Sequence, residues 1–174
     1  MKRPRLPKLE NLSEDTQRFF DVLNKESDLA VALISASYLD VSLAGMLKRR
    51  MRKSSVADSL LNPSSGALGS MASRADAAYC LELIDKRLYK DLRLVAEIRN
   101  LFAHHHFIRS FEDPDVADLV HGLEYLEMMR TSSTGEPLTV LEHASHPRSR
   151  FVLDVVLMSQ RVLVSGLSLV PCNT

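Results

Sequence analysis

The sequence has no tryptophan and few other aromatic residues, which limits the kinds of binding site that it can build. Aromatic residues make up 6% of the 174 positions, whereas hydrophobic residues as a whole make up 45%. Proteins that hold single-stranded nucleic acid stack the bases on exposed aromatic rings. A base-stacking platform is therefore not expected, but a sizeable aliphatic core within one domain is.

Cysteine is also scarce, and this bears on metal binding and on location. The two cysteines, Cys80 and Cys172, match neither a zinc-ligand spacing nor a C-x-x-C pattern. We expect two free thiols, which suit the reducing conditions of the cytoplasm. The expected location is cytoplasmic, with neither a metal nor a cofactor.

Charge of one sign does not dominate the chain, and no long apolar run is free of polar residues. Lys and Arg number 22, as do Asp and Glu, so no global field favours nucleic acid or a membrane. The beginning, MKRPRLPKLENL, lacks the apolar run of a signal peptide. Asp154, Gln160 and Arg161 interrupt the apolar segment 151–170, which is typical of a buried helix rather than a membrane span.

What the sequence does contain is helical periodicity along most of its length. We expect a flexible basic tail over residues 1–12 and a single helical domain over 13–170. No strand pattern is convincing, so the predicted fold class is all-α, a single-domain bundle of five to six helices. The helices are expected over about 14–25, 28–52, 70–84, 86–104, 114–130 and 148–169, with Ser13, Asp85 and Asp113 at N-caps.

The stretch EIRNLFAHHH, residues 97–106, is the strongest candidate for a chemical site. Arg99 and His104 are five positions apart, which is about 140° of rotation on a regular helix. Their side chains can converge only if the helix ends or distorts near Ala103, or if two subunits bring their copies together. The alternative is an ordinary helix end, where the positive charges of arginine and histidine interact favourably with the negative end of the helix dipole and have no further function.

The residues RNLFAH resemble the R-x4-6-H motif of the HEPN superfamily, in which a polar residue, often Asn, follows the arginine. The resemblance implies an α-helical bundle, and for many members a metal-independent endoribonuclease of toxin, defence or RNA-processing systems. It also implies a homodimer that places two motifs around one RNA cleft. By position, the implied catalytic residues are Arg99, Asn100 and His104, with His105 as the alternate histidine because R-x5-H is also allowed.

The chemistry of these side chains fits RNA cleavage without a metal. A neutral imidazole can accept the 2′-OH proton, and an imidazolium can protonate the leaving oxygen. A guanidinium can hold the phosphate and stabilise its developing charge, while Asn100 could orient the phosphate or the histidine. The adjacent histidines His104, His105 and His106 point in different directions from a helix, which makes a poor metal site.

A second resemblance covers more of the chain, from roughly residue 30 to 120. The run ALGSMASRADAAYCLELIDKRLYKDLRLVAEIRN, residues 67–100, is similar to the mannitol operon repressor (MltR) family. This resemblance implies an all-α, HEPN-like architecture and transcriptional repression, although the sequence has no helix-turn-helix signature. The alternative function is thus a non-enzymatic regulator that acts through protein contacts, and a third is an antitoxin or scaffold subunit. The candidate partners are RNA, a second copy of the chain, and a regulatory or antitoxin protein.

Four further features of the sequence bear on binding. The run KRRMRK is either a phosphate-binding patch or a solvated helix end. Asp40 is expected to be exposed, or to face the cleft and pair with Arg99 or a histidine. The small-residue stretch 64–69 is interpreted as a flexible turn between helices, and Tyr38 and Tyr79 are expected in the core. The basic residues of the run are Lys48, Arg49, Arg50, Arg52 and Lys53.

Overall fold

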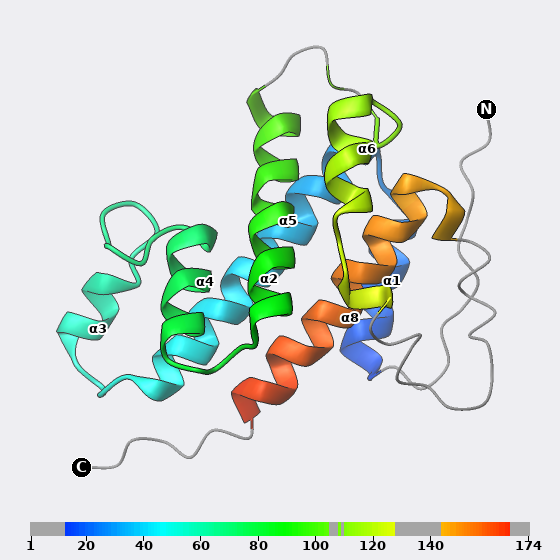
Figure 1. Ribbon diagram of the computed structural model, residues 1–174. Helices are drawn as coiled ribbons and strands as arrows, with labels where there is room; N and C mark the ends of the chain where they lie inside the picture. The colour runs from blue at the N-terminus through cyan, green and yellow to red at the C-terminus, as the bar shows by residue number, and fades with distance from the viewer. Residues whose placement is uncertain (1–12, 105–107, 109, 128–143, 168–174) are drawn as a thin grey trace.

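The computed structural model describes residues 13–104, 108, 110–127 and 144–167, and these contain seven complete helices and no strand (Figure 1). The predicted all-α bundle is confirmed, with one additional short helix. The helices are α1 (Glu14–Lys25), α2 (Asp28–Arg50), α3 (Ser55–Leu60), α4 (Met71–Cys80), α5 (Lys86–His104), α6 (Pro114–His121) and α8 (Pro147–Leu167).

Side-chain caps determine where the first helices begin. The Ser13 hydroxyl accepts from the Thr16 N–H at 3.3 Å, and the Ser27 hydroxyl accepts from the Ala30 N–H at 3.2 Å. Asp85 accepts from the Leu88 N–H at 2.9 Å. Each bond satisfies a donor that the first helical turn cannot satisfy by itself. The predicted starts of α1, α2 and α5 are confirmed.

Two predicted helix ends and one predicted turn are wrong. Helix α4 ends at Cys80, because Glu82 is left-handed (φ 56°) and Leu83 N–H turns back to the Ala78 carbonyl at 2.9 Å. Helix α6 ends at His121, with Gly122 as its C-cap, rather than near residue 130. The short helix α3 within the supposed connection was not predicted.

Helix α2 is the central element, packing against α1, α4, α5 and α8. In Figure 1, α3 and α4 lie on one side of the molecule, and α1, α6 and α8 lie on the other. The inner face of α2 buries four large side chains completely: Leu39, Leu43, Met46 and Leu47. Among the described helices, α2 alone passes a length-and-hydropathy test for crossing a membrane, a test that core helices of soluble proteins also pass.

Aromatic packing fixes the end of α5 that carries the candidate motif. The Phe102 ring lies 5.0 Å from the Phe111 ring, which in turn lies 4.7 Å from Phe151 of α8, measured between centroids. All three side chains are buried. Because Phe102 lies between Arg99 and His104 in the sequence, its burial orients both of these residues on the helix.

A buried ion pair joins the start of α2 to α8. Arg148 Nε donates to Asp28 Oδ1 at 3.0 Å, and Asp28 Oδ2 accepts from the Phe111 N–H at 3.2 Å. The Arg148 guanidinium also donates to the carbonyls of Leu23 and Glu26, both at 2.9 Å. Both oxygens of Asp28 and two nitrogens of Arg148 are thus hydrogen-bonded, which offsets the cost of burying the two charges.

Candidate functional site

Arg99 and Asn100 are held together on the exposed side of α5. Arg99 Nη1 donates to Asn100 Oδ1 at 3.1 Å. Both residues are exposed, whereas the preceding Ile98 is completely buried. Among the residues described, Arg99 has no carboxylate within ion-pair distance, so its charge is not neutralised by a neighbour.

His104 is the last residue of α5 and is exposed. The helix runs without a break from Lys86 to His104, so the distortion near Ala103 that would bring the motif together in one chain does not occur. Arg99 and His104 therefore project about 140° apart. The alternate histidine, His105, lies outside the described residues, and so does His106.

Arg99 and Asn100 line a hollow of about 550 Å³ between α2, α5 and the beginning of α4. We call this space the α2–α4–α5 hollow. His104 is not part of its wall. A second hollow of about 560 Å³ shares Ala72, Ala96 and Asn100 with the first and is lined by Lys90, Arg93 and Glu97 among others. The wall of the α2–α4–α5 hollow consists of Leu33, Ala36, Ser37, Asp40, Gly69, Ser70, Met71, Ala72, Ala96, Arg99 and Asn100.

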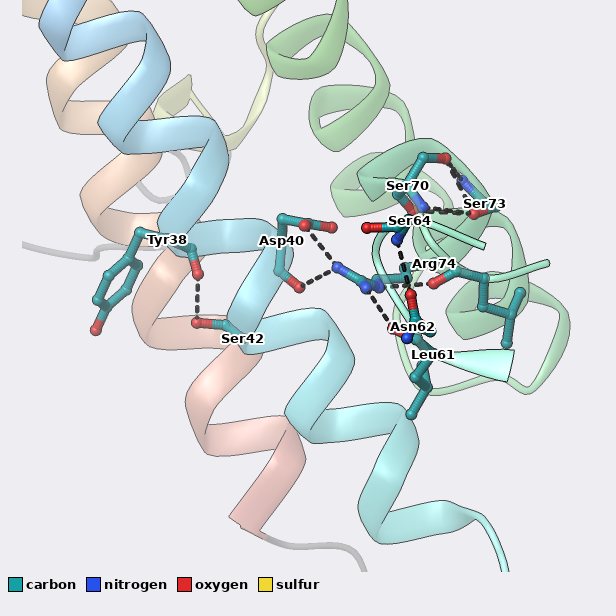
Figure 2. A network of polar contacts seen from close by, with 10 residues as sticks. Tyr38, Asp40, Ser42, Leu61, Asn62, Ser64, Ser70, Ser73 and Arg74 are labelled. Carbon is teal, nitrogen blue, oxygen red and sulfur yellow. Dashed lines mark hydrogen bonds and ion pairs between the residues drawn. The ribbon is translucent and has the colours of Figure 1, made fainter. Parts of the chain in front are cut away.

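Asp40 does line the hollow, but its partner is Arg74 rather than Arg99 or a histidine (Figure 2). Arg74 Nη1 lies 2.5 Å from Asp40 Oδ2, and Arg74 also donates to the carbonyls of Leu61 and Leu68, both at 2.8 Å. The Arg74 side chain is only 3% exposed. In Figure 2, Tyr38 lies on the opposite side of α2 from this cluster.

The connection between α3 and α4 is packed rather than flexible. Gly66 N–H donates to the Asn62 carbonyl at 2.9 Å, and Leu68 N–H donates to the Leu60 carbonyl at 2.8 Å. A Cβ on Gly66 would lie 2.2 Å from the Leu60 carbonyl oxygen, so only glycine fits. This close approach delivers the Leu61 and Leu68 carbonyls to Arg74.

The basic run at the end of α2 is exposed, but not all of it is available to a ligand. Lys48 Nζ lies 2.7 Å from Asp58 Oδ1. The Arg49 guanidinium packs against Gly166 of α8, because a Cβ added to this glycine would lie only 3.2 Å from Arg49 Nη2. Arg50, Arg52 and Lys53 are exposed and have no ion pair within the described part of the chain. The last two follow the end of α2.

Two buried carboxylates hold the segment that follows α6. Asp91 Oδ2 accepts from the N–H groups of Glu124 and Tyr125 at 3.1 and 2.8 Å, and Asp154 Oδ1 accepts from the Leu126 N–H at 2.6 Å. Burial raises the pKa of Asp91 to about 6 and that of Asp154 to about 7, although these hydrogen bonds act in the opposite direction. Sequence reasoning noted Asp154 only as an interruption of an apolar run and missed Asp91.

Two other expectations concern aromatic and metal-binding residues. Tyr38 is half-buried and stacks on Phe19 at 4.1 Å, whereas Tyr79 is 38% exposed and was wrongly placed in the core. Tyr79 stacks instead on Tyr89 at the surface, with 4.7 Å between the ring centroids. No group of three or more His, Cys, Asp or Glu residues in the described ranges could hold a metal ion.

Comparisons with known proteins show the fold of the chain but not its family. No family model matches the chain, and no curated protein matches its sequence significantly. A solved structure matches with a TM-score of 0.68 and 18% identity, covering 87% of this chain and 99% of the other. That structure is the X-ray structure of the MtlR-HPr complex from Escherichia coli.

This neighbour supports, at the level of the fold, the resemblance to the mannitol operon repressor family. It is a protein assembled with a second protein, HPr. A neighbour at 18% identity carries no residue assignments, and it does not place the chain in the HEPN superfamily.

Proposed function

We propose that the chain is a non-enzymatic cytoplasmic regulator that acts by binding another protein. The observation that carries this proposal is an apolar surface that α2 leaves open to solvent. The assembly of the structural neighbour with HPr supports the same kind of function, because this chain and the neighbour share a fold.

The surface consists of successive turns of α2. Leu33, Ile34, Tyr38 and Val41 form, with Ser37, a shallow depression of about 510 Å³. We call these five residues the α2 face. Val41 is 67% exposed, which is high for a valine in a helix that is otherwise so well packed. Leu33, Ile34 and Tyr38 are half-buried, so each leaves part of its apolar side chain open beside the exposed Val41. A contiguous apolar depression of this kind marks a site of protein contact more often than a single exposed side chain does.

The geometry of the Arg99 motif favours binding over catalysis within one chain. A general base must lie within hydrogen-bond reach of the proton that it takes, in the same site as the group that holds the phosphate. In this chain Arg99 lines the α2–α4–α5 hollow and His104 does not. A single chain therefore does not bring the two side chains into one site.

Calorimetric titration with HPr tests the proposal directly. We expect saturable binding by the wild type and a loss of at least about tenfold in affinity for Val41→Asp, because a charge would be buried at the contact. Val56→Asp is the matched control, since Val56 is 65% exposed on α3 and outside the α2 face. Absence of binding by the wild type would exclude HPr as partner, and equal binding by Val41→Asp would exclude the α2 face.

The second candidate function is a metal-independent endoribonuclease of the toxin, defence or RNA-regulatory kind. The observation that favours it is the hydrogen-bonded Arg99–Asn100 pair at an open hollow. Among the described residues no carboxylate lies within ion-pair distance of Arg99, so its charge is available to a phosphate. In this proposal a homodimer supplies His104, or alternatively His105, from the second subunit. Arg50, Arg52 and Lys53 of the basic run would then contact the phosphates of RNA, whereas Lys48 is paired with Asp58 and the Arg49 guanidinium lies against α8.

A mixing experiment tests both the activity and the shared site. RNA is incubated in EDTA with the wild type, with Arg99→Ala, with His104→Ala, and with an equal mixture of the two variants. The ribonuclease candidate predicts 2′,3′-cyclic phosphate ends for the wild type, no cleavage by either variant and partial recovery in the mixture. Recovery is expected because a mixed dimer contains one site with both side chains. No cleavage by the folded wild type, or a monomer at about micromolar concentration in sedimentation, would reject this candidate.

A further inference from the structure

The α2–α4–α5 hollow adjoins the α2 face, and it differs from that face in chemistry. The two share Leu33 and Ser37, but of the two only the hollow contains a charged side chain, Arg99, that has no ion pair among the described residues. Asp40 and Arg74 compensate each other in their ion pair. Arg99 therefore leaves the wall of the hollow with a net positive charge.

Several hydrogen-bond donors of the wall remain available to a ligand, beside the hydroxyls of Ser37 and Ser70 and the Asp40 side chain, which is 26% exposed. Asn100 uses its Oδ1 to accept from Arg99, which leaves its amide N–H groups for a ligand. At the start of α4, the reciprocal bonds between Ser70 and Ser73 occupy the backbone N–H groups of these two residues. The N–H groups of Met71 and Ala72, in the first helical turn, have no intrahelical acceptor, and both residues line the hollow.

The buried carboxylate oxygen of Asp40 does not change this balance. Asp40 Oδ1 has no hydrogen-bond partner and is covered by protein atoms, so a ligand in the hollow does not contact it. Its charge is matched by Arg74, whose side chain is almost completely enclosed. The apolar part of the wall is formed by Leu33, Ala36, Met71 and Ala96, and Ser37, Gly69 and Ser70 complete the wall.

We propose that the α2–α4–α5 hollow binds a small organic anion, a phosphate ester or a carboxylate with a compact uncharged body. The guanidinium of Arg99 and the amide of Asn100 hold the anionic group, and the apolar wall contacts the body of the ligand. A guanidinium binds the oxygens of a carboxylate or phosphate in a fixed planar geometry, which gives both affinity and selectivity. A volume of about 550 Å³ is within the range of small-molecule sites.

Ligand binding would affect the α2 face through the wall that the two sites share. A ligand against Leu33 and Ser37 changes what a partner protein meets on α2. This regulatory consequence rests on the proposed function, whereas the binding of the anion does not. The anion is thus proposed as an effector that adjusts the affinity for the partner.

The test is a titration of the full chain, labelled with ¹⁵N, with four compounds followed by NMR. Phenyl phosphate and benzoate distinguish the two anion types, inorganic phosphate lacks the apolar body, and benzyl alcohol lacks the charge. We expect saturable shifts of the Met71, Ala72 and Asn100 amides with phenyl phosphate or benzoate. Inorganic phosphate should bind more weakly, and benzyl alcohol should cause no saturable shift.

Two variants decide whether Arg99 holds the anion. Arg99→Gln should weaken binding about tenfold or more, because a charge-assisted hydrogen bond is lost. Arg87→Gln removes an exposed arginine from the first turn of the same helix and should leave binding unchanged. The proposal is overturned if neither organic anion saturates below about 20 mM, if both variants weaken binding equally, or if only an RNA oligonucleotide shifts these amides. None of these results depends on whether HPr binds the α2 face.

Discussion

Arg74 joins α4 to α2 through its ion pair with Asp40, which lines the same hollow as Arg99, and the Arg74 side chain is almost completely enclosed. Its guanidinium also holds two carbonyls of the connection between α3 and α4. One side chain therefore positions three segments of the chain. Arg74 thus fixes α4 and the connection before it against α2, and the α2–α4–α5 hollow opens between these helices and α5.

Replacement of Arg74 by methionine should lower the free energy of unfolding by about 3 kcal/mol, because it leaves the Asp40 carboxylate and two carbonyls without their donor. Urea denaturation measures the change. Arg93→Met is the control, since Arg93 and Asp76 form an ion pair of 3.4 Å with both side chains about half exposed. That variant should change the stability by less than about 1 kcal/mol. Equal effects of the two variants would contradict the role given to Arg74.

The buried carboxyl groups of Asp91 and Asp154 should make the protein less stable as the pH rises from about 4 to about 7. Their pKa values in the folded chain are about 6 and about 7, both above the usual value for aspartic acid. The folded state therefore binds protons more tightly than the unfolded state. The resulting stabilisation is complete below the unfolded pKa and is lost as the pH rises through the folded pKa, by up to about 1.4 kcal/mol per pH unit for each group.

Asp154→Asn tests how much the carboxyl group of Asp154 contributes to the pH dependence of stability. The asparagine Oδ1 can still accept from the Leu126 N–H, but the group at position 154 no longer titrates. We expect the free energy of unfolding, measured by urea denaturation at several pH values, to fall less steeply with pH for this variant than for the wild type. Asp58→Asn should keep the wild-type slope, because Asp58 is 61% exposed. A slope for Asp154→Asn equal to that of the wild type would show that this carboxyl does not titrate in the range.

Gly66→Ala should destabilise the protein by about 1–3 kcal/mol, because the new methyl group would overlap backbone atoms that cannot move independently. The nearest atom is the Leu60 carbonyl oxygen at 2.2 Å. Gly45→Ala is the matched control, since its Cβ would meet only the end of the Arg49 side chain at 3.8 Å. In the middle of α2, alanine should stabilise by up to about 1 kcal/mol. Thermal unfolding of the two variants should give shifts of opposite sign.

The helices with strong local signals were predictable from the sequence. Ser13 and Asp85 cap their helices through bonds between neighbouring residues, and such bonds are visible as residue types at fixed positions. Asp113 was correctly placed before α6, but its carboxylate accepts from the Ser110 N–H at 2.9 Å rather than capping the helix. A local pattern therefore predicted the start of the helix without predicting the bond.

The candidate site was less predictable, because its contacts join residues that are distant in the sequence. Arg74 meets Asp40 across 34 positions, and nothing near either residue indicates this pairing. The one available signal was that position 74 lies on the same helical face as the buried Met71, Ala75 and Ala78. A charged residue on an apolar face requires a partner. The pattern could have indicated that need, but not the identity of the partner.

The ribonuclease candidate predicts that the end of α2 contributes to RNA binding through Arg50 and Arg52. Neutralising both residues with Arg50→Gln and Arg52→Gln should lower the affinity and reduce the slope of log affinity against log salt concentration by about 1.4, the value for two phosphate contacts on a single strand. Arg49 is left unchanged, since its guanidinium lies against α8. Arg87→Gln, far along the chain on α5, should keep the wild-type slope. If the double variant binds RNA with unchanged affinity and salt dependence, the basic residues serve only as a solvated helix end, where positive charge stabilises the last carbonyls.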